Sequence, residues 1–328
     1  MIPLKIALIG FGNFVRNAYL PSLEYDGRAV VTSVAAPSEK TRQDAVKILG
    51  SDVAVFENGM DLLANTKPDA VMIAVPDPLH RQTLETVLKS GIPVFYEPPV
   101  AERREEISEI VEQLLHARQI THANLELGYH AAVRRVAAMV KEGTIGSLQN
   151  VTVDLQANWG GENPGLDTCL INRASCWYVN LLNCLIGSSP KRVLVLDGYG
   201  LNGRRQNVST GIFDYNGVWG FLKMNVHSAE KLALHVNLVG SSGVIDLDYF
   251  TGQISLKTLG NPNIKTEFCP ALQPHADWPG VRESVSAFLD AVLSGEASQT
   301  DAITVAELNK IGMSAEKSKD TDGWAMID

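Results

Sequence analysis

The stretch that decides the fold is KIALIGFGNFVRNAYLPSL, at Lys5–Leu23. Its apolar run Ile6–Ile9 predicts a buried strand, and Asn13–Leu23 predicts a helix. Between them, Gly10 and Gly12 allow a tight turn and a close approach of the backbone. Free amides and the positive end of the helix dipole converge on such a turn. The stretch therefore predicts an anion site of the kind that holds the pyrophosphate of a dinucleotide.

The glycine pattern is incomplete. The full dinucleotide-binding pattern is GxGxxG, and Val15 stands at the position of the third glycine. The same residues would also suit an ordinary strand–turn–helix unit of an α/β core, so the motif alone leaves both interpretations open.

The composition is that of an ordinary globular protein. The 328 residues are 45% hydrophobic and 20% charged, and the length suggests two domains. A formal net charge of -9 argues against a nucleic-acid surface. No apolar run approaches the ~18 residues of a membrane span, and no leader pattern precedes the first strand. We expect a cytoplasmic protein whose partner is a small molecule, without nucleic acid or membrane.

The four cysteines carry no recognisable metal or redox pattern. They show neither a CxxC pair nor the spacing of a metal-ligand set, so no metal site is expected. They are Cys169, Cys176, Cys184 and Cys269.

Strand and helix patterns alternate through the first 123 residues. After the first strand, further strands are predicted at 29–35, 53–56, 70–75, 94–96 and 120–123. Helices are predicted between them at 41–49, 60–63, 80–90 and 102–118. Alternation with short connections predicts an α/β fold, a doubly wound parallel sheet with helices on both faces.

The second half has a different pattern. Strands are predicted at 147–158, 191–199, 208–215, 218–227, 232–240, 244–249 and 254–259, with a buried helix at 171–186. Asn216-Gly217 predicts a hairpin turn between two of them. A helix at 280–294 carries one apolar face, which we expect to pack back toward the first domain.

The end of the second strand bears on which dinucleotide would bind. NAD-specific folds carry an acid there that binds the ribose hydroxyls. That place falls near Ala36, and Ser38, Lys40 and Arg42 follow. Hydroxyl and cationic groups could hold a 2′-phosphate, so we expect NADP to be slightly favoured over NAD. Alternatively, Ser38 only caps the next helix and the two cations are solvated.

Three blocks of the sequence resemble the Gfo/Idh/MocA family, the glucose–fructose oxidoreductase- and inositol dehydrogenase-like enzymes. The blocks are IALIGFGNFVRNAYLPSL (6–23), DAVMIAVPDPLHRQTLETVLKSGIPVFYEPPVA (69–101) and YHAAVRRVAAMVKEGTIGSLQNV (129–151). The resemblance implies an NAD(P)-binding Rossmann domain at 1–123. It also implies an α+β domain at 124–328 with a large, mostly antiparallel sheet, through which homodimers or homotetramers would assemble.

With the resemblance, the expected cofactor contacts come from the glycine turn and from the ends of the second, fourth and fifth strands. They are Gly10, Gly12, Asn13, Phe14, Ser38, Arg42, Val75, Pro76, His80, Glu97 and Pro98.

The residues that handle protons in the family are replaced. Family enzymes that oxidise hydroxyls carry Glu-Lys-Pro after the fifth strand, and an Asp and a His four residues apart on the helix corresponding to 171–186. Here the loop is Glu97-Pro98-Pro99, so Pro98 occupies the lysine position. If the helix matches without a gap, Arg173 and Trp177 occupy the Asp and His positions.

Alcohol oxidation by the family mechanism is therefore not expected, because a proline side chain cannot exchange a proton. One remaining function is a reductase of a C=N, conjugated C=C or C=O group with non-standard proton handling. Biliverdin reductases are similar in carrying Glu-Tyr-Pro at this loop and lacking the Asp/His pair. A second is a catalytically silent sensor or regulatory subunit, and a third is dehydrogenation by relocated groups.

Candidates for relocated groups can be named. Tyr129 and His130 begin the helix after the sixth strand and could deliver a proton; alternatively, Tyr129 packs and His130 caps. Trp159, Arg173 and Trp177 could form a pocket for a planar, acidic substrate. The alternative is that Arg173 pairs with a buried acid and both tryptophans belong to the core.

Overall fold

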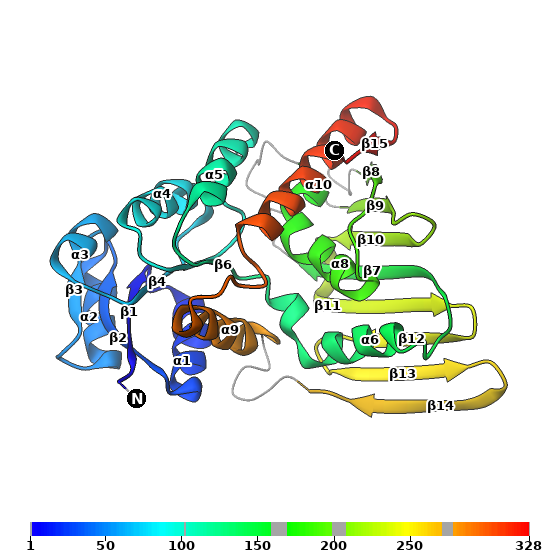
Figure 1. Cartoon of the computed structure of the whole chain (residues 1–328), viewed down its shortest axis with the longest axis horizontal. Helices are drawn as coiled ribbons and strands as arrows, with labels where there is room; N and C mark the ends of the chain where they lie inside the picture. The colour runs from blue at the N-terminus through cyan, green and yellow to red at the C-terminus, as the bar shows by residue number, and fades with distance from the viewer. Residues whose placement is uncertain (1, 102, 159–168, 199–207, 271–277, 328) are drawn as a thin grey trace. The chain divides into compact units, whose positions relative to one another are not determined.

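The computed structural model describes residues 2–101, 103–158, 169–198, 208–270 and 278–327. The chain forms two compact units. The first, the Rossmann unit, comprises Met1–Leu125 and Val281–Ala306. The second, the sheet unit, comprises Glu126–Gly280 and Glu307–Asp328. In Figure 1 the strands β1–β6 belong to the Rossmann unit and β7–β15 to the sheet unit.

The Rossmann unit is built on a six-stranded parallel sheet in the order β3-β2-β1-β4-β5-β6. Every residue of β4 and the last four residues of β1 are buried, as expected of a parallel sheet with both faces covered. This topology confirms the predicted doubly wound sheet. Its strands are β1 (Leu4–Ile9), β2 (Ala29–Ala35), β3 (Ala54–Phe56), β4 (Ala70–Ile73), β5 (Val94–Tyr96) and β6 (Thr121–Ala123).

The helices of this unit begin and end within two residues of the predicted positions, with one exception. The predicted helix Asn13–Leu23 is a π-turn, η1 (Val15–Tyr19), continued by α1 (Leu20–Asp26). The others are α2 (Glu39–Leu49), α3 (Gly59–Asn65), α4 (His80–Ser90) after the 3-10 turn η2 (Asp77–Leu79), and α5 (Arg104–His116).

Helix α9 (Val281–Ser294) belongs to the Rossmann unit although it lies far along the chain. It packs against η1 and α1, and Figure 1 shows it beside α1. Its apolar face, which includes Val285, Phe288 and Leu289, is buried.

His122 on β6 fixes this returning segment to the sheet. The imidazole is fully buried and stacks on Phe95, with ring centroids 4.9 Å apart. Its Nε2 lies 3.0 Å from Ser284 Oγ on α9, and its Nδ1 lies 2.6 Å from Ser298 Oγ. Burial lowers the pKa of His122 to about 3, so the ring is neutral at physiological pH.

The sheet unit holds a nine-stranded sheet in the order β14-β13-β12-β11-β7-β10-β9-β8-β15. The pair β7–β10 is parallel and the other pairs are antiparallel, which confirms the predicted mostly antiparallel sheet. Its strands are β7 (Leu148–Asn158), β8 (Arg192–Gly198), β9 (Val208–Asp214), β10 (Trp219–Asn225), β11 (His227–Gly240), β12 (Gly243–Asp248), β13 (Gln253–Thr258), β14 (Asn261–Phe268) and β15 (Ala325–Met326).

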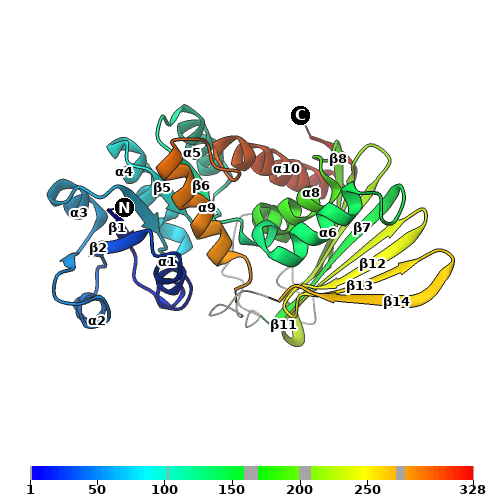
Figure 2. The ribbon, with the colours of Figure 1, turned by 60° about the horizontal axis from the view of Figure 1, so that its bottom comes forward.

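One face of this sheet is covered by helices. Figure 2 shows α6 (Ala131–Lys141) and α8 (Asn180–Ile186) against it. Alternate residues of β7, such as Val153 and Leu155, point to this face and are fully buried. At the predicted hairpin, Asn216 and Gly217 have φ of 63° and 103°, as a type I′ turn requires.

Three elements of this part of the chain have no counterpart in the predictions. They are β14, β15 and α10 (Ala302–Thr321). Strand β14 is polar and mostly exposed at the sheet edge, so it lacks an apolar alternation. Helix α10 buries polar side chains, Glu316 and Ser318, and this obscures its amphipathic period. Within the described residues, no helix is both long enough and apolar enough to cross a membrane.

Candidate functional site

The glycine turn lies where the backbone leaves β1. Gly10 has φ of 95°, and a Cβ on it would lie 2.0 Å from the carbonyl oxygen of Ala74. Only glycine is compatible with both the conformation and the contact. A Cβ on Gly12 would meet no described atom within 4 Å, so the turn is open on that side. The turn therefore packs tightly on the end of β4 and presents its second glycine to a ligand.

The π-turn η1 follows immediately. Val15, at the third glycine position, is buried. A third glycine would let the helix pack close to the strand, and here the helix instead has the wider π geometry at Val15–Tyr19. Arg16 lies on this turn, and its backbone N–H donates to Gly12 O. The Arg16 side chain lies beside the glycine turn, with its Nε donating to Gly12 O at 3.4 Å and its Nη1 3.7 Å from Asp44 Oδ2.

A cavity of about 670 Å³ opens at the carboxyl ends of β1, β2 and β4. Strands to the two sides of β1 belong to opposite halves of the sheet, and nucleotides bind at this switch point in such folds. The volume lies in the range of small-molecule sites. The described lining residues are Ile9, Gly10, Phe11, Gly12, Arg16, Ala35, Ala36, Pro37, Ser38, Thr41, Glu57, Asn58, Gly59, Met60, Asp61, Ala74, Val75, Pro76, Leu79, Gln82, Thr83 and Thr86.

The structure brings five of the expected cofactor contacts together in this cavity. They are Gly10, Gly12, Ser38, Val75 and Pro76. The cradle at Gly10 and the cationic Arg16 fit the pyrophosphate of a dinucleotide.

The other expected contacts lie behind or beside this wall. Asn13 accepts a hydrogen bond from Asn17 at 2.8 Å, and the ring of Phe14 packs edge-on against Tyr19. The imidazole of His80 is buried between two carbonyl oxygens, with Nδ1 2.6 Å from Pro99 O and Nε2 2.8 Å from Val75 O. His80 thereby ties the end of β4 to the loop after β5, where the Pro98–Pro99 bond is cis.

A half-buried acid, Glu97, follows β5. Glu97 Oε1 accepts hydrogen bonds from Tyr19 OH and from Asn124 Nδ2, the latter at 2.9 Å. Burial raises the pKa of Glu97 to about 7; the two hydrogen bonds oppose the rise and the negative charge of Asp77 adds to it. These groups come from η1 and from the ends of β4, β5 and β6. The arrangement can hold a proton near neutral pH at this edge of the sheet.

In the sheet unit, His130 caps helix α6. Its Nδ1 accepts a hydrogen bond from Ala132 N–H at 3.2 Å, and its Nε2–H donates to Tyr249 O at 2.9 Å. Burial lowers the pKa of His130 to about 4, so the ring is neutral and both nitrogens serve the backbone. Tyr129 is buried, with the Arg134 guanidinium 5.0 Å from its ring centroid. The sequence left open whether His130 delivers a proton or caps the helix, and its hydrogen bonds are those of a helix cap.

The expected substrate pocket is described only in part, since Trp159 lies outside the described residues. Arg173 lies on α7 (Leu170–Ala174), and Trp177 lies in the π-turn η4 (Ser175–Val179), which leads into α8. Both side chains are partly exposed. A π-turn has an additional residue per turn, so the spacing that puts two side chains on one face of an α-helix does not hold through it. The replacement of the family's Asp and His stays a prediction.

Several wall residues were missed by sequence reasoning. Glu57, Asn58 and Asp61 follow β3, and Gln82 and Thr83 lie on α4. The carboxyl ends of parallel strands share one edge of a sheet, so the segment after the third predicted strand could have been included. Within the described residues, no group of three or more His, Cys, Asp or Glu side chains is arranged to hold a metal ion.

Comparison with known proteins agrees with this geometry. Residues 4–124 match the Gfo/Idh/MocA family model, described as an oxidoreductase family with an NAD-binding Rossmann fold. An uncharacterized oxidoreductase of Synechocystis sp. is 28% identical over 176 residues, which are 53% of this chain and 44% of the relative. Inositol 2-dehydrogenase of Klebsiella pneumoniae is 24% identical over 170 residues, 52% of this chain and 50% of the relative. The matches thus span about half the length of these curated relatives or less.

Solved structures share the fold along the whole chain. A levoglucosan dehydrogenase in complex with NADH and levoglucosan has a TM-score of 0.85, covering 99% of both chains at 14% identity. An oxidoreductase from Agrobacterium radiobacter, in complex with NAD+, L-tartaric acid and magnesium, has a TM-score of 0.83 at 16% identity, covering 99% of this chain and 98% of that one. Identities this low show the fold alone.

Proposed function

Since residues 4–124 belong to the Gfo/Idh/MocA family of NAD-binding oxidoreductases, we propose that the whole chain is a nicotinamide-dependent reductase. The observation that carries the proposal is the cavity at the switch point of the Rossmann sheet, with Gly10 held at the end of β4 and Arg16 beside it. A reduced nicotinamide, when bound, supplies a hydride.

The proposed roles of the protein groups follow from the site. The amides of the glycine turn bind the pyrophosphate, and Arg16 adds positive charge beside it. Glu97 holds the proton that the substrate needs, because its carboxyl is protonated up to about neutral pH. Tyr19 and Asn124 donate to the same oxygen of Glu97 and stabilise the carboxylate that is left after the proton has gone.

The proposed substrate is a small molecule with a C=N, conjugated C=C or C=O group. Hydride adds to the carbon, and the proton from Glu97 goes to the other atom of the double bond or to its conjugated end. Pro98, in the place of the family lysine, has no proton to give, so the chain needs either this acid or a substrate that takes its proton from water. Glu97 then regains a proton from solvent.

The test is a substrate panel. The purified protein would be mixed with NADPH or NADH and with imines, linear tetrapyrroles and keto-sugars, and the reduced-nicotinamide absorbance followed. Loss of that absorbance with at least one substrate class supports the reductase, and an approximately 100-fold slower rate in Glu97→Gln supports the role of the carboxyl.

A second candidate is a catalytically silent binder that acts as a sensor or regulatory subunit. Pro98 is the observation that favours it, since the family's proton donor is missing there. Tight binding of the dinucleotide with no turnover across the whole panel would favour the binder over the reductase.

We further propose that copies of the chain form a homodimer or homotetramer through the nine-stranded sheet. Leu194, Ile212 and Phe221 lie in register on neighbouring strands and are partly exposed, on the face opposite to the buried alternate residues. A second copy placing the same row against it would cover apolar surface on both. Light scattering should give a dimer or tetramer mass, and Phe221→Lys should shift it toward the monomer; a monomeric wild type would overturn the proposal.

A further inference from the structure

We propose that Glu57, at the end of β3, binds the adenosine ribose and makes the site select NAD over NADP. This inference rests on the proposed function, in that it takes the cavity of the Rossmann unit to be the dinucleotide site. The sequence argument from Ser38, Lys40 and Arg42 favours NADP, and the geometry of these residues leads to the opposite expectation.

Glu57 lies where the missing acid of β2 would be. The last residues of β2 and β3, Ala35 and Phe56, are paired in the sheet, and Ala36 N–H donates to Phe56 O at 3.0 Å. Glu57, the residue that follows β3, therefore lies beside the end of β2. Both Ala36 and Glu57 line the cavity. A carboxylate delivered from the neighbouring strand can accept hydrogen bonds from ribose hydroxyls as one from β2 does in NAD-specific folds.

Arg42 is committed to the backbone. Its Nη1 donates to Ala36 O and to Pro37 O, both at 2.8 Å, and its Nη2 lies 3.4 Å from Glu57 Oε1. The guanidinium side chain is only 16% exposed, whereas the Glu57 side chain is 75% exposed. Arg42 thus holds the loop after β2 in place and orients Glu57, instead of presenting its donors to a phosphate.

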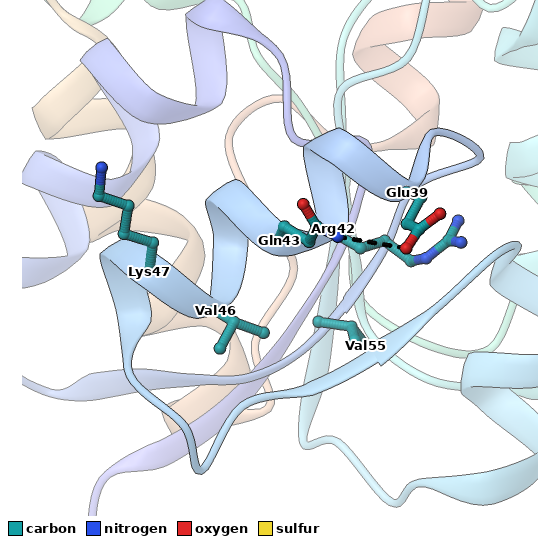
Figure 3. Close-up of a pocket in the computed structure, with 6 residues that line it drawn as sticks. All are labelled: Glu39, Arg42, Gln43, Val46, Lys47 and Val55. Atoms are coloured by element: carbon teal, nitrogen blue, oxygen red, sulfur yellow. Dashed lines mark hydrogen bonds between the residues drawn. The ribbon is translucent and has the colours of Figure 1, made fainter.

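Arg42 lines a different hollow, which is drawn in Figure 3. This second cavity, of about 530 Å³, is formed by Glu39, Arg42, Gln43, Val46 and Lys47 of α2 together with Val55 of β3. Gln43 donates to Glu39 at 3.2 Å there. Lys40 is exposed and lines neither cavity among the described residues.

The charged side chains that line the ribose end of the dinucleotide cavity are acids, and Arg42 contacts one of them, Glu57, from outside the wall. Asp61 is the second acid in the wall, fixed by Asn58, whose Nδ2 donates to Asp61 Oδ2 at 2.8 Å. Among the described lining residues, Arg16 is the only cation, and it stands at the glycine turn, where the pyrophosphate is expected. A 2′-phosphate would bring two further negative charges against Glu57, whereas a 2′-hydroxyl can donate to it.

The experiment measures affinities for NAD+, NADP+ and 2′-deoxy-NAD+ by titration calorimetry on the full chain. The wild type should bind NAD+ at least about tenfold more tightly than NADP+ or 2′-deoxy-NAD+, because a charge-assisted hydrogen bond is lost with either. In Glu57→Gln the preference for NAD+ over NADP+ should shrink by about tenfold. Glu39→Gln removes the same charge from the second cavity and should leave the preference within about twofold.

Arg42→Gln separates the two roles of the arginine. If Arg42 holds the loop, the variant weakens NAD+ and NADP+ binding together, whereas a phosphate-binding Arg42 would weaken NADP+ alone. Equal or tighter NADP+ binding by the wild type overturns the inference and leaves the reductase proposal standing. The inference is also overturned, with the reductase proposal left standing, if Glu57→Gln keeps the wild-type preference for NAD+ over NADP+ as fully as Glu39→Gln does. If neither nucleotide binds, the proposed function itself fails.

Discussion

Each unit of the molecule has a helix with a π-turn at its candidate site. The two sites differ in whether backbone or side chains form the wall. In the Rossmann unit η1 follows the glycine turn, and the cavity wall includes backbone and small residues such as Gly10, Ala36 and Ala74. In the sheet unit η4 carries Trp177, and a pocket there would depend on the directions of long side chains such as Arg173. A backbone wall persists as long as the fold persists, but a side-chain pocket changes with each substitution. The match of residues 4–124 to the NAD-binding family model therefore bears on the Rossmann cavity and leaves the reaction open.

The largest expected effect breaks the backbone wall. Gly10→Ala should lower the free energy of unfolding by about 3 kcal/mol or more, because the new methyl group meets Ala74 O and φ is positive. NADH affinity should fall at least about 100-fold with it.

Urea unfolding and fluorescence titration with NADH would measure these changes. Gly12→Ala is the matched control, since its methyl group meets open space: stability should stay within about 1 kcal/mol while NADH binding weakens about tenfold. A Gly10→Ala protein as stable as the wild type would show that the turn does not have this geometry.

The next largest effect is on turnover, and it distinguishes a proton donor in the Rossmann unit from one in the sheet unit. Glu97→Gln in the Rossmann unit and Tyr129→Phe in the sheet unit each remove one candidate donor. Because Glu97 is hydrogen-bonded to Tyr19 and Asn124 and has a raised pKa, we expect its loss to lower turnover about 100-fold. Tyr129→Phe should change turnover less than about threefold. Steady-state rates with the substrate found in the panel decide between them. The reverse result would assign the proton to Tyr129, and losses in both would contradict the assignment to Glu97 alone.

A smaller effect is the pH dependence of stability that Glu97 contributes. Its pKa is about 7 in the folded chain against 4.5 for the free side chain, so the folded state binds more protons between these values. The stabilisation is complete below pH 4.5 and is lost as the pH rises through 7. The free energy of unfolding of the wild type, minus that of Glu97→Gln, should fall by about 2–3 kcal/mol as the pH rises over this interval. Urea unfolding at a series of pH values measures it. The subtraction removes the contributions of His122 and His130 to the pH dependence, because both proteins contain these residues. A difference that does not change with pH would contradict the raised pKa of Glu97.

The smallest expected effect concerns the cap in the sheet unit. His130→Ala removes the acceptor for Ala132 N–H and the donor for Tyr249 O, and should cost about 1–2 kcal/mol of stability. His130→Asn, which can still cap, should recover about half of that loss. Thermal unfolding at neutral pH measures both. A full loss of turnover in a stable His130→Asn protein would instead restore His130 as a catalytic residue.

The sequence was informative where one local pattern determines one local structure. The apolar run Ile6–Ile9 could only be a buried strand before two glycines, and Asn216-Gly217 could only be a tight turn between strands. Both are found as expected. The parallel, doubly wound sheet was predicted from the alternation of strands and helices, and the structure supplies the order of its strands.

What could not be predicted depends on groups brought together by the fold. Glu57 belongs to the cavity because β3 pairs with β2, and the pairing partner is not written next to Glu57 in the chain. Tyr19 meets Glu97 across 78 positions, so neither residue has a local signature of the contact. The π-turns that begin at Val15 and Ser175 change the helical register by about one residue, which is too small a change to recognise from the spacing of apolar residues.

The return of α9 to the first unit sets an order on how the molecule can be made. During synthesis the first 125 residues leave the ribosome long before Val281–Ala306 exists, and those early residues include His122. Until Ser284 and Ser298 arrive, that imidazole lacks both hydroxyl partners. The nucleotide-binding unit therefore completes its core only near the end of translation, after the sheet strands β7–β14 have already emerged.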